Sequence, residues 1–363
     1  MTAKASWYAS ELRRELGARN RRWAQGRAHV ESYGTPPVIV YEPEHATDED
    51  LSLHPKEQER LPGDPGAGTP QNKGRHGNFF DESYTAIAAR PEWMRRFDKI
   101  HAQGRSLPKA ERRWRELDSS MSSDALLMNV FCAPGVAEAP AMRRALGIEE
   151  DGLPEFGWKA RVPLASGKFD RTEVDMRWGS LLVEAKLTEG DFQTRAARIV
   201  EGYRDFDAVF ERERLPRVEL RTARRRTAVE FAEEFTQEWE EAAEDSEGAR
   251  AFQLGIVTRA REAEPAEAGY AGYQLIRNVL AAYAAGCSFC VIHDERRPDL
   301  REMWFKVMAA VKQADMRMRC KVMTWQELAG MLPDGLQEFL DLKYGIATCG
   351  GADAADAALG GAV

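Results

Sequence analysis

Two carboxylates and a lysine stand close together within residues 169–188, and their spacing could support metal-assisted chemistry. Gly179-Ser180 lies between two runs rich in strand-forming residues, which predicts a hairpin with a two-residue turn. Counting outward from this turn places Asp175 opposite Glu184. Carboxylates in such a cross-strand pair repel each other, whereas a bound divalent cation such as Mg²⁺ would coordinate both. Lys186 lies two residues farther along the same face, where its ammonium group could position or deprotonate a water molecule.

The same count predicts which side chains share a face of the hairpin, because successive strand residues point to opposite faces. Glu173 is expected opposite Lys186, on the charged face. The apolar face, which we expect to lie on a core, consists of the pairs Trp178–Leu181, Met176–Val183 and Val174–Ala185. Charged residues that alternate with apolar ones also occur on any half-exposed strand. A solvated outer face is therefore an equally good interpretation of the spacing alone.

The hairpin also carries a pattern that resembles the PD-(D/E)xK signature of restriction-endonuclease-like nucleases. Asp175 is followed, after eight intervening residues, by Glu184-Ala185-Lys186. Val174 stands where the signature has its proline, and an apolar run, residues 181–183, leads into the second half of the motif.

A second segment extends this resemblance. Residues 273–278 are similar to the helix that follows the catalytic strands in many of these enzymes, in which a glutamine lies near the site; here it is Gln274. The resemblance covers about residues 116–345, and the N-terminal third of the chain carries none of the superfamily motifs.

The resemblance implies an α/β fold: a restriction-endonuclease-like mixed sheet with an α-β-β-β-α-β core, helical insertions, and an N-terminal helical or irregular extension. It also implies a Mg²⁺-dependent endonuclease, with Mn²⁺ as an alternative cation, that hydrolyses phosphodiester bonds in DNA. Asp175 and Glu184 would then hold the metal, and Lys186 would orient water or stabilise charge on phosphorus. Gln274 is the fourth catalytic candidate.

A further metal ligand is implied by the same family. The helix before the first core strand often adds an acidic residue near the metal, and Asp124 is the candidate, with Glu116 behind it. Serines at 119–123 are candidate N-caps of this helix, which we expect to continue to Cys132. Asp124 could equally do no more than support the first helical turn, because a negative charge there is favourable.

Several functional settings remain compatible with the sequence. The resemblance most often implies restriction or another defence against foreign DNA, while repair and recombination nucleases share the same core. A non-catalytic nucleic-acid-binding module on this fold is the competing class, and an unrelated α/β protein with a chance motif is a third possibility. A homodimer is compatible with each of these settings.

The chain of 363 residues is predicted to be organised in three parts. Residues 1–115 form a helical extension that contains a flexible loop at 42–77. The nuclease-like core follows at 116–345, with an insertion at about 211–250 and a helix expected over 195–214. Residues 346–363 are Ala/Gly-rich and are expected to be disordered.

Composition favours a soluble protein, and DNA is its expected partner although the net charge by itself opposes one and each basic patch could equally be a solvated helix face. Residues are 43% hydrophobic and 30% charged, and no apolar run approaches the ~20 residues of a membrane helix. The N-terminus lacks an apolar signal segment, which predicts a cytoplasmic protein. The net charge is −8, but residues 4–27 and 90–115 are basic and could contact phosphates. The two cysteines of Cys287–Cys290 should face opposite sides of a strand, which disfavours a shared zinc ion.

Overall fold

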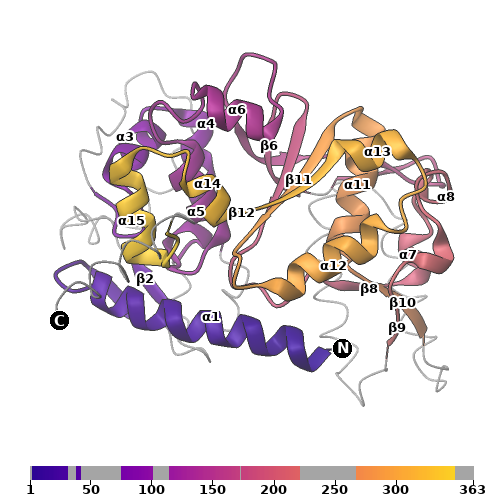
Figure 1. Cartoon of the computed structure of the whole chain (residues 1–363), viewed down its shortest axis with the longest axis horizontal. Helices are drawn as coiled ribbons and strands as arrows, with labels where there is room; N and C mark the ends of the chain where they lie inside the picture. Colours follow the sequence, from indigo (N-terminus) through magenta and orange to yellow (C-terminus); the bar gives the residue numbers. More distant parts are fainter. Residues whose placement is uncertain are drawn as a thin grey trace, which may run out of the picture.

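The computed structural model describes residues 2–31 (side chains from residue 7), 38–41, 75–100, 114–171, 173–220 and 267–347. Its centre is a mixed five-stranded sheet in the order β12-β11-β7-β6-β3 (Figure 1). The three strands β12, β11 and β7 are parallel, whereas β6 is antiparallel to both β7 and β3. The strands are β3 (Glu155–Lys159), β6 (Glu173–Trp178), β7 (Leu181–Ala185), β11 (Ser288–His293) and β12 (Cys320–Thr324). The predicted α/β class with a mixed sheet is confirmed.

The predicted β6–β7 hairpin is present, and its register is confirmed over the three pairs nearest the turn; the predicted pairs Asp175–Glu184 and Glu173–Lys186 lie beyond this ladder. Gly179 opens the turn with φ of +57°, a conformation that favours glycine, and Trp178 pairs with Leu181. The apolar face differs from the prediction at one end. Val174 packs in the cluster on the other side of the sheet, because the β6–β7 ladder stops at Met176 and the start of β6 pairs with β3 alone.

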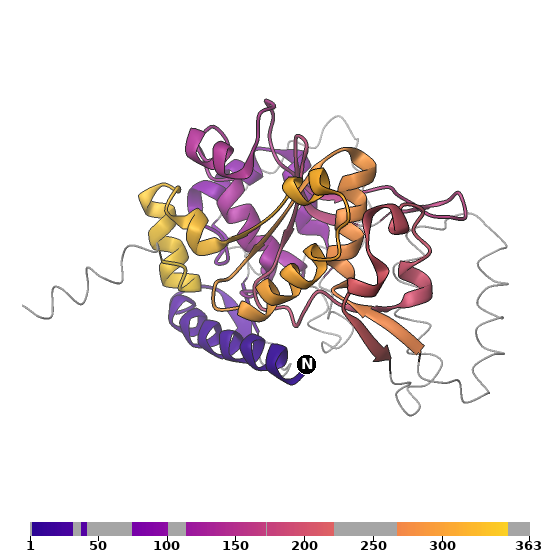
Figure 2. The same cartoon turned by 45° about the vertical axis from the view of Figure 1, so that its right-hand side comes forward.

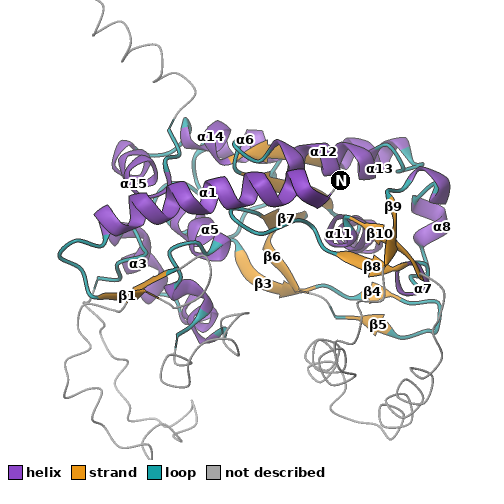
Figure 3. Ribbon diagram, turned by 90° about the horizontal axis from the view of Figure 1, so that it is seen from below, coloured by secondary structure: helices purple, strands orange, loops and turns teal. Residues whose placement is uncertain are grey.

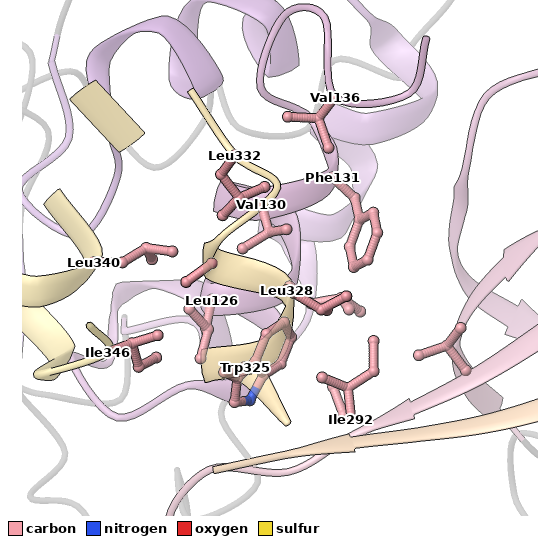
Figure 4. Close-up of a cluster of buried hydrophobic side chains, with 14 of the residues drawn as sticks. Leu126, Val130, Phe131, Val136, Ile292, Trp325, Leu328, Leu332, Leu340 and Ile346 are labelled. Carbon is pink, nitrogen blue, oxygen red and sulfur yellow. The ribbon is translucent and has the colours of Figure 1, made fainter. Parts of the chain in front are cut away.

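One face of the sheet is covered by helices from both ends of the chain. They are α5 (Ser123–Phe131), α6 (Pro140–Leu146), α14 (Trp325–Ala329) and α15 (Asp334–Tyr344). Figure 4 shows Leu126, Trp325 and Leu328 of this layer packed near Ile292 of β11. The predicted N-cap of α5 is present, since Ser122 accepts a hydrogen bond from the Ala125 amide (3.1 Å). This cap fixes the start of α5, and with it the position of Asp124.

The opposite face is covered by helices from the second half of the chain (Figure 2). They are α7 (Ala197–Val200), α8 (Phe206–Val209), α11 (Tyr273–Ala285), α12 (Pro298–Met308) and α13 (Ala314–Arg319). Gly286 ends α11 in the left-handed conformation, as its sequence predicts. Cys287 packs in this layer while Cys290 packs in the first, so the two cysteines do face opposite sides of the sheet.

The prediction of a helix over residues 195–214 is wrong. Residues 194–196 instead form β8 and pair with β10, and the rest is divided into α7, α8 and the 3₁₀ turn η5 (Arg212–Arg214). Gly202 lies in the turn between the two helices, where an added Cβ would come within 3.1 Å of the Ile199 carbonyl. A continuous helix therefore gives way to two short ones around a tight turn.

Small sheets surround the central one. The strands β8 (Thr194–Ala196), β10 (Glu267–Ala271) and β9 (Arg217–Leu220) form one of them, in that order. Two further pairs are β4 (Val162–Pro163) with β5 (Phe169–Asp170), and β1 (His29–Glu31) with β2 (Ile39–Tyr41).

A short helical segment docks on the edge of the sheet next to α5. It comprises α3 (Asp81–Ala88), α4 (Pro91–Met94) and the 3₁₀ turn η1 (Arg95–Asp98), and η4 (Glu116–Asp118) follows later in the chain. The Trp93 indole donates to the Pro154 carbonyl (2.9 Å) and packs edge-on against Phe156 of β3. This anchor brings η1 beside the N-terminus of α5.

The N-terminal helix α1 (Thr2–Trp23) runs across the molecule from α15 to α12 (Figure 3). Leu12 and Leu16 lie in the same buried cluster as α5 and β7. The predicted division at residue 115 stays a prediction, but α1 shares its core with residues 116–345.

Several predictions fall outside the described residues: most of the 42–77 loop, the greater part of the 211–250 insertion, and nearly all of the 346–363 tail. Within the described part of the chain, no helix is both long enough and apolar enough to cross a membrane.

Because α1 contributes to the core, Leu16→Ala should reduce the free energy of unfolding by about 2–5 kcal/mol, the usual cost of truncating a buried leucine. Arg14→Ala is the matched control on the same helix, since its side chain is 78% exposed and surface changes cost within ~0.5 kcal/mol. Urea unfolding of both variants tests this prediction. Equal stabilities would show that α1 contributes no core packing.

Candidate active site

The structure brings Asp175 and Glu184 together at the end of the β6–β7 hairpin. Asp175 Oδ2 accepts a hydrogen bond from the Ala185 amide (2.8 Å), which takes the place of a backbone ladder bond. The two oxygens of Glu184 have different partners, Lys186 Nζ (2.8 Å) and Asn278 Nδ2 (2.7 Å). Glu184 is therefore held in a single orientation from β7 on one side and from α11 on the other.

Lys186 joins this site, although its partner is not the predicted one. Glu173 was expected opposite Lys186, but it pairs instead with Arg96, Lys99 and Lys159. Lys186 is only 5% exposed, so its place on the sheet is interior rather than solvated. Burial alone would lower the pKa of Lys186, but the carboxylates of Glu184 and Glu189 raise it. The lysine is accordingly charged.

Asp124 lies at the site and in the first turn of α5, so both interpretations of this residue fit its position. It is 5% exposed, and its Oδ2 binds Arg96 Nη2 (2.7 Å) and Lys99 Nζ (3.0 Å). Burial alone would raise the pKa of Asp124, but these two cations lower it. Glu116 begins η4, and its amide donates to the Lys99 carbonyl (2.9 Å).

The pKa of Asp175 moves in the opposite direction. Burial raises it well above the usual carboxylate range, and the charges of Glu184 and Asp124 raise it further. Glu173, nearer the surface, contrasts with it: burial alone would raise its pKa, but Lys99 and Arg96 lower that pKa to about 2. Of Asp124, Glu173 and Asp175, it is therefore Asp175 whose negative charge is least compensated by neighbouring cations.

Gln274 lies in the first turn of α11, one helical turn before Asn278, and positions four apart share a helix face. Its side-chain oxygen is buried and has no hydrogen-bond partner among the described residues. Asn278 and the buried Arg277 were not identified as site residues from the sequence. Their polar types on a helix facing the hairpin are the signal that could have identified them.

Comparisons with known proteins identify the family of this chain. A family model described as "Restriction Endonuclease associating with ARP" (REase-ARP) matches residues 46–345. The chain belongs to the REase-ARP family. No curated protein and no solved structure matched. The predicted likeness to restriction endonucleases is confirmed at this level, and family membership gives the chain a nuclease-related role.

The REase-ARP match begins at residue 46, well before the region covered by the superfamily motifs. This wider extent agrees with the structure, because Arg96 and Lys99 reach the site from η1 and the residue just after it. Neither was predicted as a site residue; both were assigned only to a basic patch over 90–115.

A buried arginine shapes the loop after β7. Arg297 is fully buried and donates to the carbonyls of Leu187 (3.2 Å), Glu189 (2.7 Å) and Gly190 (3.0 Å). Glu189 in turn accepts from the Leu187 amide (2.7 Å) and from the Ser123 hydroxyl. The loop that follows Lys186 is therefore tied to α5, which carries Asp124.

Asp175 and Glu184 offer carboxylate oxygens to a metal ion. Within the described ranges, no group of three or more His, Cys, Asp or Glu side chains is arranged to hold a metal ion by itself. Mg²⁺, however, is usually held by one or two carboxylates together with waters and substrate phosphates. Asp175 and Glu184 supply two carboxylates, and the raised pKa of Asp175 marks a position where added positive charge would be favourable. The residues present fit Mg²⁺ in this manner.

The raised pKa of Asp175 predicts a pH-dependent stability. The native state holds the Asp175 proton more tightly than the unfolded chain, whose aspartates titrate near pH ~4, so native stability falls as pH rises above that value. Asp175→Asn removes this charge and should melt at a higher temperature than the wild type in EDTA at neutral pH. The difference should shrink toward pH ~4.

Thermal melts of the two proteins across this pH range are the measurement. Asp315→Asn is the control, because this aspartate is 70% exposed and should show little change in melting temperature at any pH. A difference between Asp175→Asn and wild type that stayed constant with pH would contradict the assigned shift.

Proposed function

We propose that this protein is a Mg²⁺-dependent endonuclease that hydrolyses phosphodiester bonds in DNA, with Mn²⁺ as an alternative ion. The observation that carries the proposal is the meeting of Asp175, Glu184 and Lys186 in one buried site of a chain from a restriction endonuclease family. The elements α5, β3, β6, β7, α11 and β11 follow one another in this order along the chain, with other short elements between them, which supports a restriction-endonuclease-like core.

Asp175 and Glu184 would hold the metal, and Asp124 would be a third acidic residue near it. When bound, a divalent ion supplies Lewis-acid polarisation of the phosphate and makes a neighbouring water more acidic. Asn278 fixes the orientation of Glu184 through its hydrogen bond to Oε2. The paired cations on Asp124 keep that carboxylate ionised.

Lys186 carries the positive charge that stabilises the developing charge on phosphorus. Its ion pair with Glu184 (2.8 Å) sets the position of the ammonium group before substrate binds. Gln274 has a buried side-chain oxygen that can accept a hydrogen bond, which is what a residue orienting the attacking water requires.

The biological setting follows the family description. Its words name an association with ARP, so we include such an association alongside DNA. Defence against foreign DNA is the role we favour, with repair or recombination as the alternative. A homodimer is part of the same proposal.

A non-catalytic DNA-binding module is the second candidate function. The observation in its favour is that Asp124 is already paired with Arg96 and Lys99, which leaves fewer oxygens for a metal. The two functions are separated by incubating the purified protein with supercoiled plasmid in Mg²⁺ and in EDTA. Cleavage that needs Mg²⁺ supports the nuclease, whereas a stable complex without cleavage in either condition supports the binding module.

Lys186→Gln should lower the cleavage rate by on the order of 10²–10³, because one preorganised charge near the reacting phosphate is lost. Glutamine can still donate to Glu184, which limits the cost of leaving that buried carboxylate without its partner. Asp175→Asn should differ in kind and also raise the Mg²⁺ concentration needed for half-maximal rate.

Lys306→Gln is the control for this comparison, since Lys306 pairs with Glu302 on the surface of α12. Mg²⁺ titrations of cleavage, with thermal melts as the folding check, give the result. A folded Lys186→Gln protein with the wild-type rate would remove this lysine from the mechanism.

A further inference from the structure

Lys99 occupies an unusual position beside the active site. It follows η1, and its ammonium nitrogen lies 3.0 Å from Asp124 Oδ2 and 3.1 Å from Glu173 Oε1. Its side chain is 35% exposed, whereas that of Asp124 is 7% exposed. Lys99 thus links a buried carboxylate of the site to the solvent.

Arg96 already binds the same two carboxylate oxygens. Its Nη2 lies 2.7 Å from Asp124 Oδ2 and its Nη1 lies 2.7 Å from Glu173 Oε1, and its side chain is 7% exposed. Gly157 of β3 makes room for it, since an added Cβ there would come within 2.3 Å of the guanidinium. Arg96 is therefore the buried counterion of Asp124 and Glu173. Lys99 is a second cation that binds the same two carboxylate oxygens.

The surroundings of Glu173 carry an excess of positive charge. Three cations, Arg96, Lys99 and Lys159, share the two carboxylates of Asp124 and Glu173. The side-chain exposure of these cations rises from 7% for Arg96 to 35% for Lys99 and 54% for Lys159. A row of positive charge that leads from the site to the surface attracts an anion to that edge.

We propose that Lys99 is a phosphate ligand of the active site, which binds a non-bridging oxygen of the DNA phosphodiester next to the one that is cleaved. This inference rests on the proposed nuclease function. On substrate binding the Lys99 ammonium leaves Asp124 and Glu173 to Arg96, so neither carboxylate loses its last counterion. Lys186, which is held by Glu184, is assigned to the phosphate that is cleaved, and this leaves the neighbouring phosphate to Lys99.

The test is DNA binding in EDTA, where no cleavage occurs. Lys99→Gln should weaken the affinity for a short DNA duplex and reduce the slope of log affinity against log salt by about 1 between ~50 and ~200 mM salt. Lys99→Arg keeps the charge and should retain the wild-type slope. Lys306→Gln removes the same charge from the surface of α12 and should also retain it. An unchanged slope for a folded Lys99→Gln protein would overturn the proposal.

Inorganic phosphate separates this proposal from the proposed function. Phosphate should raise the melting temperature of the wild type more than that of Lys99→Gln. If the wild type neither binds nor cleaves DNA but keeps this Lys99-dependent response, the nuclease function fails and the phosphate site stands. If the wild type cleaves DNA while Lys99→Gln matches it in salt slope, KM and phosphate response, the nuclease stands and the phosphate site fails.

Discussion

The site depends on the compensation of buried negative charge. Asp124 and Glu184 are buried and Asp175 beside them is half-buried, and an uncompensated carboxylate in such a place is unfavourable. Arg96 and Lys99 compensate Asp124, while Lys186 compensates Glu184. Asp175 alone has no cation of its own in direct contact among the described residues, and the raised pKa of its carboxyl is the consequence. Asp175 is therefore the residue at which an added cation would be most favourable.

Arg96 is placed by packing outside the hairpin, and the loop after Lys186 is held in a similar way. Trp93 anchors the segment that carries Arg96, and Gly157 provides the space into which its guanidinium fits. On the other side, Arg297 holds the loop after Lys186 through three backbone carbonyls. A buried arginine that makes several hydrogen bonds fixes backbone geometry more firmly than a single contact could. The site is consequently rigid on both sides of β7.

Local patterns predicted much of this fold. The turn at Gly179-Ser180 gave the register next to it, and strand geometry gave the opposite faces of Cys287 and Cys290. The helix that begins at Tyr273 was expected from the family resemblance. In these segments the local preferences of neighbouring residues all favour the same structure. The predicted helix over 195–214 was wrong because strand pairing with β10, in which Ala196 pairs with Gly269 and Thr194 with Ala271, outweighed a helical pattern interrupted by Gly202.

The site was predicted less completely than the fold, for a related reason. Asp175, Glu184 and Lys186 lie within twelve residues, so strand geometry alone relates them. The partners that determine their charge states are distant in sequence: Arg96 lies 28 residues from Asp124, and Asn278 lies 94 residues from Glu184. Such contacts depend on the packing of whole elements, which periodicity does not encode.

These partners also set how a metal ion would enter. In the proposed function, the raised pKa of Asp175 and the ion pair between Lys186 and Glu184 would both oppose binding of a divalent ion by itself. Metal binding of this kind releases protons and is weak at low pH. A phosphate that arrives with the ion brings oxygens to complete its coordination and offers Lys186 an alternative anion. If the proposed function holds, these same contacts would favour joint binding of ion and substrate over binding of the ion alone.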